Sequence, residues 1–300
     1  LNPNFAHEIA NSYIDFGSWA KEIIGQKVQK ISVDAGFSCP NRDGRVGWGC
    51  CTFCDNSTFS PAYCSSEKSV TAQLQEGKTF FKRKYPDMKY LAYFQSYSNT
   101  YGNLSHLQTI YEEALAVEDV VGIVIGTRPD CISDELLDYL SNLSKRAFVL
   151  VEYGVESVND EVLLRVNRGH NFQCALDAVK RTSRAGLFVG AHIILGLPGE
   201  SETENIQGIK ALYNNGMKLL KLHQLQIIRG TKMAAEYQEK PFPLYTADEY
   251  ISTIVRYISA LPDDIVYDRF VSQSPPDKVL APNWGLKNHE FTDKLSKALK

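Results

Sequence analysis

The stretch AFVLVEYGVES, residues 147 to 157, is a short run of β-branched and aromatic residues that is mostly apolar at successive positions. A strand that is apolar on both faces belongs to a parallel sheet whose faces are covered by helices. Five further runs are of this kind: KISVDAG (30 to 36), YLAYFQS (90 to 96), VGIVIGT (121 to 127), LFVGAHIILG (187 to 196) and LKLHQLQII (220 to 228). Together these runs predict six parallel strands.

Segments of helical periodicity lie between these strands and have readable boundaries. Ser133 and Asn171 are each predicted to cap a helix, and Gly186 to end the second one. Ser201 and Thr246 each stand three residues before a glutamate, which is the pattern of a capping box. The six units predict an α/β protein, but they are too few for a closed eight-stranded barrel. An open partial barrel and a doubly wound sheet both fit.

The two ends of the chain differ from the middle. Residues 1–28 are predicted to form an N-terminal helix or arm, and residues 29–230 the main α/β unit. Residues 231–300 are predicted to be an α/β extension packed on that unit, with a helix, a strand at DIVYDRF (264 to 270), a proline-rich loop and a last helix.

Composition narrows the class of protein. The chain has 300 residues, 44% of them hydrophobic, which is enough for a substantial core. Its net charge of −3 argues against coating nucleic acid by charge alone, although it leaves room for a local basic face. No apolar run approaches the roughly 18 residues of a membrane span, and none resembles a signal sequence. We expect a cytoplasmic protein with no membrane partner.

Four of the seven cysteines lie in CPNRDGRVGWGCCTFC, residues 39 to 54, just beyond the first predicted strand. Active sites of parallel α/β proteins are built at this edge of the sheet. An odd and clustered set of cysteines is unlike a disulfide scaffold, and in a reducing compartment it indicates metal binding or redox chemistry.

Two kinds of metal site are compatible with this spacing. Two residues separate Cys51 from Cys54, which is half of a zinc knuckle, but eleven residues separate Cys39 from Cys51 and Cys39 has no partner pair. An iron–sulfur cluster held by three thiolates fits better, because one iron then stays open to a substrate or cofactor. A zinc-stabilised α/β binding protein remains the alternative from another class.

The longer stretch DAGFSCPNRDGRVGWGCCTFCDN, residues 34 to 56, resembles the radical S-adenosylmethionine (SAM) superfamily, and within it the YhcC/YtqA group, which is related to the radical domain of the Elongator catalytic subunit. The resemblance continues through AYFQSYSNTY, IGTRPDC, VEYGVESVNDEVLLRVNRGH, HIILGLPGE and LHQLQIIRGT. It implies a 4Fe–4S cluster, SAM bound at the open iron, and a partial (β/α)6 barrel of the TIM type, with an N-terminal arm and a C-terminal α/β extension.

The resemblance also sorts the four clustered thiols. It implies that Cys39, Cys51 and Cys54 are the cluster ligands, because the group usually has glycine at the position that Cys50 occupies. A one-residue slip, with Cys50 in place of Cys51, remains open. The isolated Cys64, Cys131 and Cys174 are most simply small buried hydrophobic residues.

The resemblance also implies which positions of this sequence contact SAM. The segment YFQSYSNTY takes the place of the superfamily's Gly-Gly-Glu segment, so we nominate its polar side chains for the methionine end of SAM: Gln95, Ser96 and Asn99. Glu156 and Arg168 are twelve residues apart, as in the coproporphyrinogen-dehydrogenase branch, which implies contacts with the ribose and the carboxylate of SAM.

Two further side chains join this candidate set. Glu152 faces the same side of its strand as Glu156, and a carboxylate inside a parallel barrel is costly unless it is used or paired. His192 stands where the same branch has an aspartate. His192 and His223 each face either the lumen or the helices, and a core histidine is the alternative for both. No residue is assigned a catalytic role.

The resemblance implies reductive cleavage of SAM and removal of hydrogen from a substrate, with an electron donor such as flavodoxin or ferredoxin. The related enzymes make tRNA modification, at a wobble-uridine side chain, the first substrate hypothesis. KTFFKRKYPDMK (78 to 89) and the lysine-rich tail (278 to 300) are candidate phosphate contacts, or else solvated helix faces. A small metabolite or a peptide is the alternative substrate.

Overall fold

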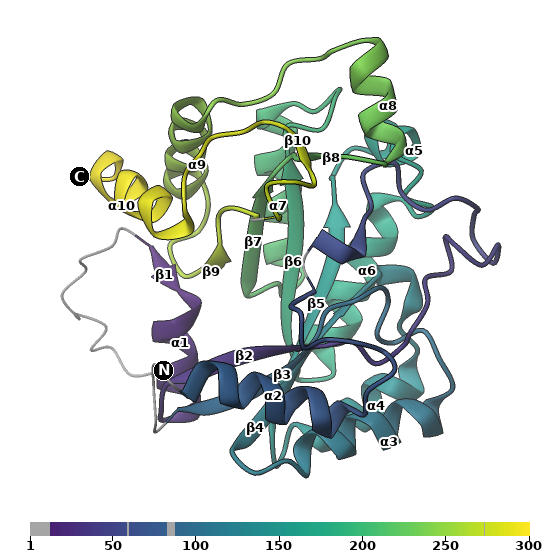
Figure 1. Ribbon diagram of the computed structural model, residues 1–300. Helices are drawn as coiled ribbons and strands as arrows, with labels where there is room; N and C mark the ends of the chain where they lie inside the picture. Colours follow the sequence, from purple (N-terminus) through teal and green to yellow (C-terminus); the bar gives the residue numbers. More distant parts are fainter. Residues whose placement is uncertain (1–12, 59, 83–87, 273) are drawn as a thin grey trace.

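In the computed structural model, which describes residues 13–58, 60–82, 88–272 and 274–300, parallel strands form one curled sheet (Figure 1). The sheet has eight strands in the order β1-β9-β7-β6-β5-β4-β3-β2. Their bounds are β1 Ile14–Asp15, β2 Val28–Val33, β3 Lys89–Phe94, β4 Val120–Thr127, β5 Phe148–Glu156, β6 Phe188–Leu195, β7 Leu219–Gln224 and β9 Val266–Arg269.

Helices lie between successive strands of this sheet, because parallel neighbours need a crossover connection. Their bounds are α1 Phe16–Ile24, α2 Val70–Lys82, α3 Leu104–Leu115, α4 Asp134–Leu143, α5 Asp160–Arg165, α6 Phe172–Arg184, α7 Glu202–Asn214, α8 Lys232–Glu239, α9 Ala247–Ala260 and α10 Asn288–Ala298. Short 3₁₀ turns lie at Asn56–Thr58 and Pro129–Cys131.

Five of the six predicted strands are confirmed, as β2 to β6. The prediction of one strand over 220–228 is wrong, because the run divides into β7 and β8 (Ile227–Ile228). β8 turns away and pairs antiparallel with β10 (Val279–Ala281) in a separate two-stranded sheet.

Both flanking segments contribute to the main sheet. The predicted strand at 264–270 forms β9, which pairs in parallel with β7, and β1 pairs in parallel with β9. The arm therefore supplies an edge strand, and the C-terminal extension supplies the strand beside β7.

The sheet is a half-barrel, which settles the choice between the two predicted architectures. Its convex side packs on the crossover helices through residues such as Ile123, Val151 and Val189. Its concave side is filled at the strands' N-terminal ends by α1, where Trp19 lies edge-on to Phe188, with ring centroids 4.9 Å apart. Beyond this apolar plug, the concave side becomes polar.

The predicted helix caps are largely as expected. The side chains of Ser133, Asn171 and Ser201 each accept a hydrogen bond from a backbone N–H in the first helical turn. Of the two predicted capping boxes, only the one at Thr246 is complete, because Glu204 instead accepts from Asn159 Nδ2 at 3.2 Å. In the part of the chain that the structure describes, no helix combines the length and apolarity needed to cross a membrane.

Candidate functional site

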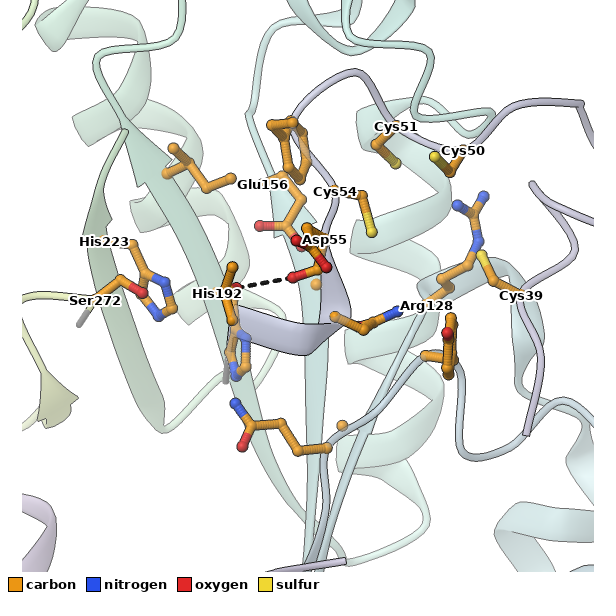
Figure 2. Close-up of a pocket in the computed structure, with 18 of the residues that line it drawn as sticks. Cys39, Cys50, Cys51, Cys54, Asp55, Arg128, Glu156, His192, His223 and Ser272 are labelled. Carbon is orange, nitrogen blue, oxygen red and sulfur yellow. Dashed lines mark hydrogen bonds between the residues drawn. The ribbon is translucent and has the colours of Figure 1, made fainter. Parts of the chain in front are cut away.

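The four clustered cysteines line one cavity of about 210 Å³ at the C-terminal ends of the strands. Figure 2 shows their thiols on one side of this cavity, His223 and Ser272 on the other, and Glu156 and His192 between them. Burial, followed by the neighbouring Cys51 and Cys50, raises the pKa of the Cys54 thiol to about 12. The Cys54 thiol is therefore buried near those of Cys51 and Cys50.

The connection between α5 and α6 holds the cysteine loop in place. Asn167 Nδ2 donates to the backbone oxygens of Trp48 and Cys50, at 3.2 and 2.8 Å. The Thr52 N–H donates to the Val166 oxygen at 3.0 Å. The segment VNR in the sequence is therefore a clamp on a loop that lies more than a hundred residues away.

Cys50 has a left-handed backbone, with φ of 56°. Glycine adopts this region freely, whereas other residues pay roughly 1–2 kcal/mol for it. This conformation gives a physical reason for the glycine that the resemblance implies at this position. Cys50 keeps the turn through its own N–H, which donates to the Asn41 oxygen at 2.9 Å.

Arg168 is buried against Cys51 and Glu156. Its Nη1 donates to Cys51 Sγ at 3.6 Å, its Nη2 donates to the Gly154 oxygen, and the same nitrogen lies 3.7 Å from Glu156 Oε1. Burial disfavours the charged guanidinium, but Cys51 and Glu156 reverse this and raise the pKa of Arg168. A Cβ on Gly154 would lie 2.8 Å from Arg168 Nη2, so this glycine makes room for the pair.

A second arginine, Arg128, follows β4 and lines the same cavity. Its Nε and Nη2 donate to the two carboxylate oxygens of Asp130, both at 2.8 Å. Among the described residues, its Nη1 and the Nε of Arg168 are buried without a hydrogen-bond partner. Buried N–H groups are rarely left in this state, so both point to a ligand in the cavity.

A ring of buried charges lies deeper in the lumen. Glu152 is 2% exposed, and its carboxylate accepts from Lys30 at 2.8 Å, Lys221 at 2.7 Å and His192 Nε2 at 2.9 Å. Asp268 pairs with the same two lysines, at 2.8 and 2.7 Å. Two cations and two carboxylates balance, and we call these four residues (Lys30, Glu152, Lys221 and Asp268) the charged ring.

His192 and His223 both lie on the lumen side, with their rings stacked at a centroid distance of 5.8 Å. Burial, followed by the cation of Lys221, lowers the pKa of His192 to about 4. The imidazole is therefore neutral at pH 7, and its Nε2–H donates to Glu152.

The structure brings most of the nominated side chains together around the cavity: Gln95, Glu152, Glu156, Arg168 and His192. Ser96 and Asn99 are buried outside the lining. Ser96 Oγ lies 3.4 Å from Ser60 Oγ, and Asn99 Nδ2 donates to the backbone oxygens of Phe94 and Gly126, at 3.1 and 2.8 Å. Asn99 thus ties the ends of two strands.

Other side chains that line or support the cavity were not singled out from the sequence, namely Asn41, Arg128, Asn167, Arg269 and the lysines of the charged ring. A signal for the ring existed, because Lys30 and Lys221 are charges inside runs that read as buried strands. Arg128 lies in IGTRPDC, one of the segments that carry the resemblance.

Family models match nearly all of the chain from the cysteine loop onward. The model described as the radical SAM superfamily matches residues 38–211, which is more than half of the chain. The chain belongs to the radical SAM superfamily. A second model, described as the Radical_SAM C-terminal domain, matches residues 217–300.

Full-length relatives place this radical SAM protein in the YhcC/YtqA group, as predicted. YtqA of Bacillus subtilis (strain 168) is 33% identical over 93% of this chain and 87% of YtqA. YhcC of Escherichia coli (strain K12) is 34% identical over 90% of this chain and 86% of YhcC.

More distant relatives share part of their length with this chain. A protein of Methanocaldococcus infernus named tRNA uridine(34) acetyltransferase is 26% identical over 58% of this chain and 33% of its own. The structure of archaeal Elp3 from the same species, with an N-terminal deletion, superposes with a TM-score of 0.63 at 18% identity. That match covers 91% of this chain but only 64% of the Elp3 chain, and it shows the fold.

The family match confirms several predictions at once. The chain is a radical SAM enzyme, its cofactors are a 4Fe–4S cluster and SAM, and it requires a reductant. The alternative of a zinc-stabilised binding protein is set aside.

Proposed function

We propose that Cys39, Cys51 and Cys54 bind the 4Fe–4S cluster, and that SAM occupies the adjoining cavity. The observation that carries this proposal is the position of all three thiols on one cavity, beside a buried arginine that donates to Cys51. Cysteine thiolates bind the separate irons of a cluster, so they need not converge on one point. Among the described residues, no three or more His, Cys, Asp or Glu side chains are placed to hold a single metal ion.

The cofactors, when bound, supply a carbon radical that takes a hydrogen atom from an unactivated C–H bond. The chain itself binds and orients the cofactors and the substrate, and it excludes water from the site. Arg168 Nη1 and Asn41 Nδ2 donate to Cys51 Sγ at 3.6 and 3.7 Å, and hydrogen bonds to the sulfurs help to set a cluster's reduction potential.

Side chains around the cavity are suited to hold SAM. Arg128 Nη1 and Arg168 Nε have no partner among the described residues and can donate to the carboxylate of SAM. Glu156 and Gln95 line the cavity and can accept from hydroxyl or amino groups. Burial raises the pKa of Glu156, although Arg168 and Arg128 oppose the shift. Glu152 lies deeper in the lumen and contributes by orienting His192, whose Nε2 donates to its carboxylate.

Iron and sulfide content after anaerobic reconstitution tests the ligand assignment. Cys39→Ala, Cys51→Ala and Cys54→Ala should each hold much less iron than the unaltered chain. Cys50→Ala is the matched control, since it removes a thiol from the same loop, and it should keep the cluster. A full cluster in Cys51→Ala, or its loss in Cys50→Ala, would overturn the assignment.

For the substrate, we propose a uridine of tRNA, at the wobble position. Support comes from the similarity to a relative whose name includes tRNA uridine(34) and from the polar and charged side chains among those that line the lumen. Basic surface gives limited support. Lys78 and Lys89 both pair with Asp119, at 3.3 and 2.7 Å, and residues 83–87 of the basic stretch lie outside the described residues.

Modified nucleosides in total tRNA provide the test. A strain that lacks the gene should lose or gain a uridine derivative, and the unaltered gene should restore the parental profile. A gene with Cys51→Ala is the matched control and should fail to restore it. An unchanged profile in the deletion strain would refute the tRNA substrate, and it would leave the cluster assignment to its own experiment.

We further propose that a flavodoxin or ferredoxin of the cytoplasm supplies the electron. None of the seven cysteines forms a disulfide, which suits a reducing compartment. Reduced flavodoxin or ferredoxin should replace a chemical reductant in SAM cleavage, and failure of both would refute this choice of donor.

A further inference from the structure

The side of the cavity opposite the thiols carries a cation that has no counter-charge among the described residues. Arg269 is the last residue of β9 and lines the cavity. Its Nε and Nη2 each lie 3.4 Å from His223 Nε2, and it forms no ion pair with any Asp or Glu in the described ranges. A guanidinium offers five N–H donors, so most of its capacity is unused.

The histidine beside Arg269 is uncharged. Burial, followed by the cation of Arg269, lowers the pKa of His223 well below its ordinary value. His223 Nε2 therefore accepts from Arg269, and the ring supplies no negative charge. At 3.4 Å these contacts are longer than a good N–H donor distance, so they hold the guanidinium loosely.

Neighbouring carboxylates are already committed. Asp268, next to Arg269 in the strand, pairs with Lys30 and Lys221, and Glu152 pairs with the same lysines. The charged ring is neutral as a whole, so it leaves the charge of Arg269 uncompensated. A half-buried cation in this state is stabilised when an anion enters the cavity.

We infer that Arg269 and His223 form a subsite for an oxyanion, a phosphate or a carboxylate, carried by the substrate. The inference rests on the proposed function, because the lumen is where the substrate would meet the radical. His223 and Ser272 lie across the cavity from the thiols in Figure 2, so an anion held here anchors the substrate at the end remote from the cluster. The uncharged part of the substrate then extends toward the cofactors.

Titration calorimetry on the reconstituted enzyme loaded with SAM provides the test. SAM fills the positions near Arg128 and Arg168, so added anions report on the remaining lumen. Inorganic phosphate and acetate are the two probes, which distinguish a phosphate-bearing from a carboxylate-bearing substrate. At least one should bind, and Arg269→Gln should weaken it by about 10-fold or more, as expected for loss of a charge-assisted hydrogen bond. Arg269→Lys, which keeps the charge but loses the fork, should bind with intermediate affinity.

The matched control is Arg256→Gln, which removes an arginine that is 53% exposed and paired with Glu202. It should bind the probes as the unaltered enzyme does. The inference is wrong if neither anion binds, or if Arg269→Gln and Arg269→Lys bind both as tightly as Arg256→Gln. SAM cleavage by the unaltered enzyme tests the proposed function separately. If the enzyme cleaves SAM but anion binding does not depend on Arg269, the subsite is refuted and the proposed function is not.

Discussion

The charged ring predicts a large loss of stability from a nearly isosteric change. Glu152→Gln keeps the shape of the side chain but removes a charge that faces Lys30 at 2.8 Å and Lys221 at 2.7 Å, with only 2% of the carboxylate side chain exposed. Removing one partner of a buried ion pair typically costs 3–5 kcal/mol, because the other charge stays buried and unpaired. Asp268 still faces both lysines, so we expect a cost near 3 kcal/mol, at the low end of that range.

Equilibrium urea unfolding, followed by circular dichroism, measures this cost. The matched control is Glu112→Gln, which breaks the ion pair with Arg146 at the surface, where the two side chains are 45% and 55% exposed, and which should cost about 1 kcal/mol or less. Adding Lys221→Met to Glu152→Gln leaves Lys30 and Asp268 as a balanced pair and should recover part of the loss. Equal costs for Glu152→Gln and Glu112→Gln would refute the account of the ring.

Three other predictions concern the rest of the fold. Trp19→Ala should destabilise the chain by about 3–5 kcal/mol in urea unfolding, because the 8% exposed indole plugs the half-barrel; a cost under about 1 kcal/mol would contradict this role. Burial raises the pKa of Glu200 to about 7, above the unfolded value of 4.5, so the folded state binds the extra proton and stability should fall as the pH rises from 4.5 to 7. As the pH rises through that range, the free energy of unfolding of Glu200→Gln should increase by up to about 3 kcal/mol relative to that of the unaltered chain. Parallel pH profiles of the two would refute this prediction. The pKa of His192, lowered to about 4 by burial, means that the unfolded state binds the extra proton, so this residue should cost stability as the pH falls from 6.5 to 4; a His192→Gln chain with an identical slope would contradict it.

Local patterns were sufficient to predict most of the half-barrel. Strands β2 to β6 are long apolar runs whose period and turns are legible without knowledge of their neighbours. β1 was not predicted because two residues, Ile14 and Asp15, carry no periodicity. The break between β7 and β8 was missed because both halves are apolar, and only the pairing with β10 separates them.

The candidate site was predictable where one segment carries it. The four clustered cysteines lie in one short stretch and the pair Glu156 and Arg168 in another, and all six side chains line the cavity. The charged ring depends on which strands are neighbours, so the pairing of Lys30 with Glu152 could not be read from either segment alone. Ser96 lies beyond the end of β3 at Phe94, where alternation no longer predicts the direction of a side chain.

The central claim is that Cys39, Cys51 and Cys54, and not Cys50, make this chain a working radical SAM enzyme. Formation of 5′-deoxyadenosine from SAM by anaerobically reconstituted, reduced protein tests it most directly. We predict that the unaltered chain and Cys50→Ala form 5′-deoxyadenosine, and that Cys39→Ala, Cys51→Ala and Cys54→Ala form none above background. Sustained formation by Cys51→Ala, or none by the unaltered chain, would contradict the account.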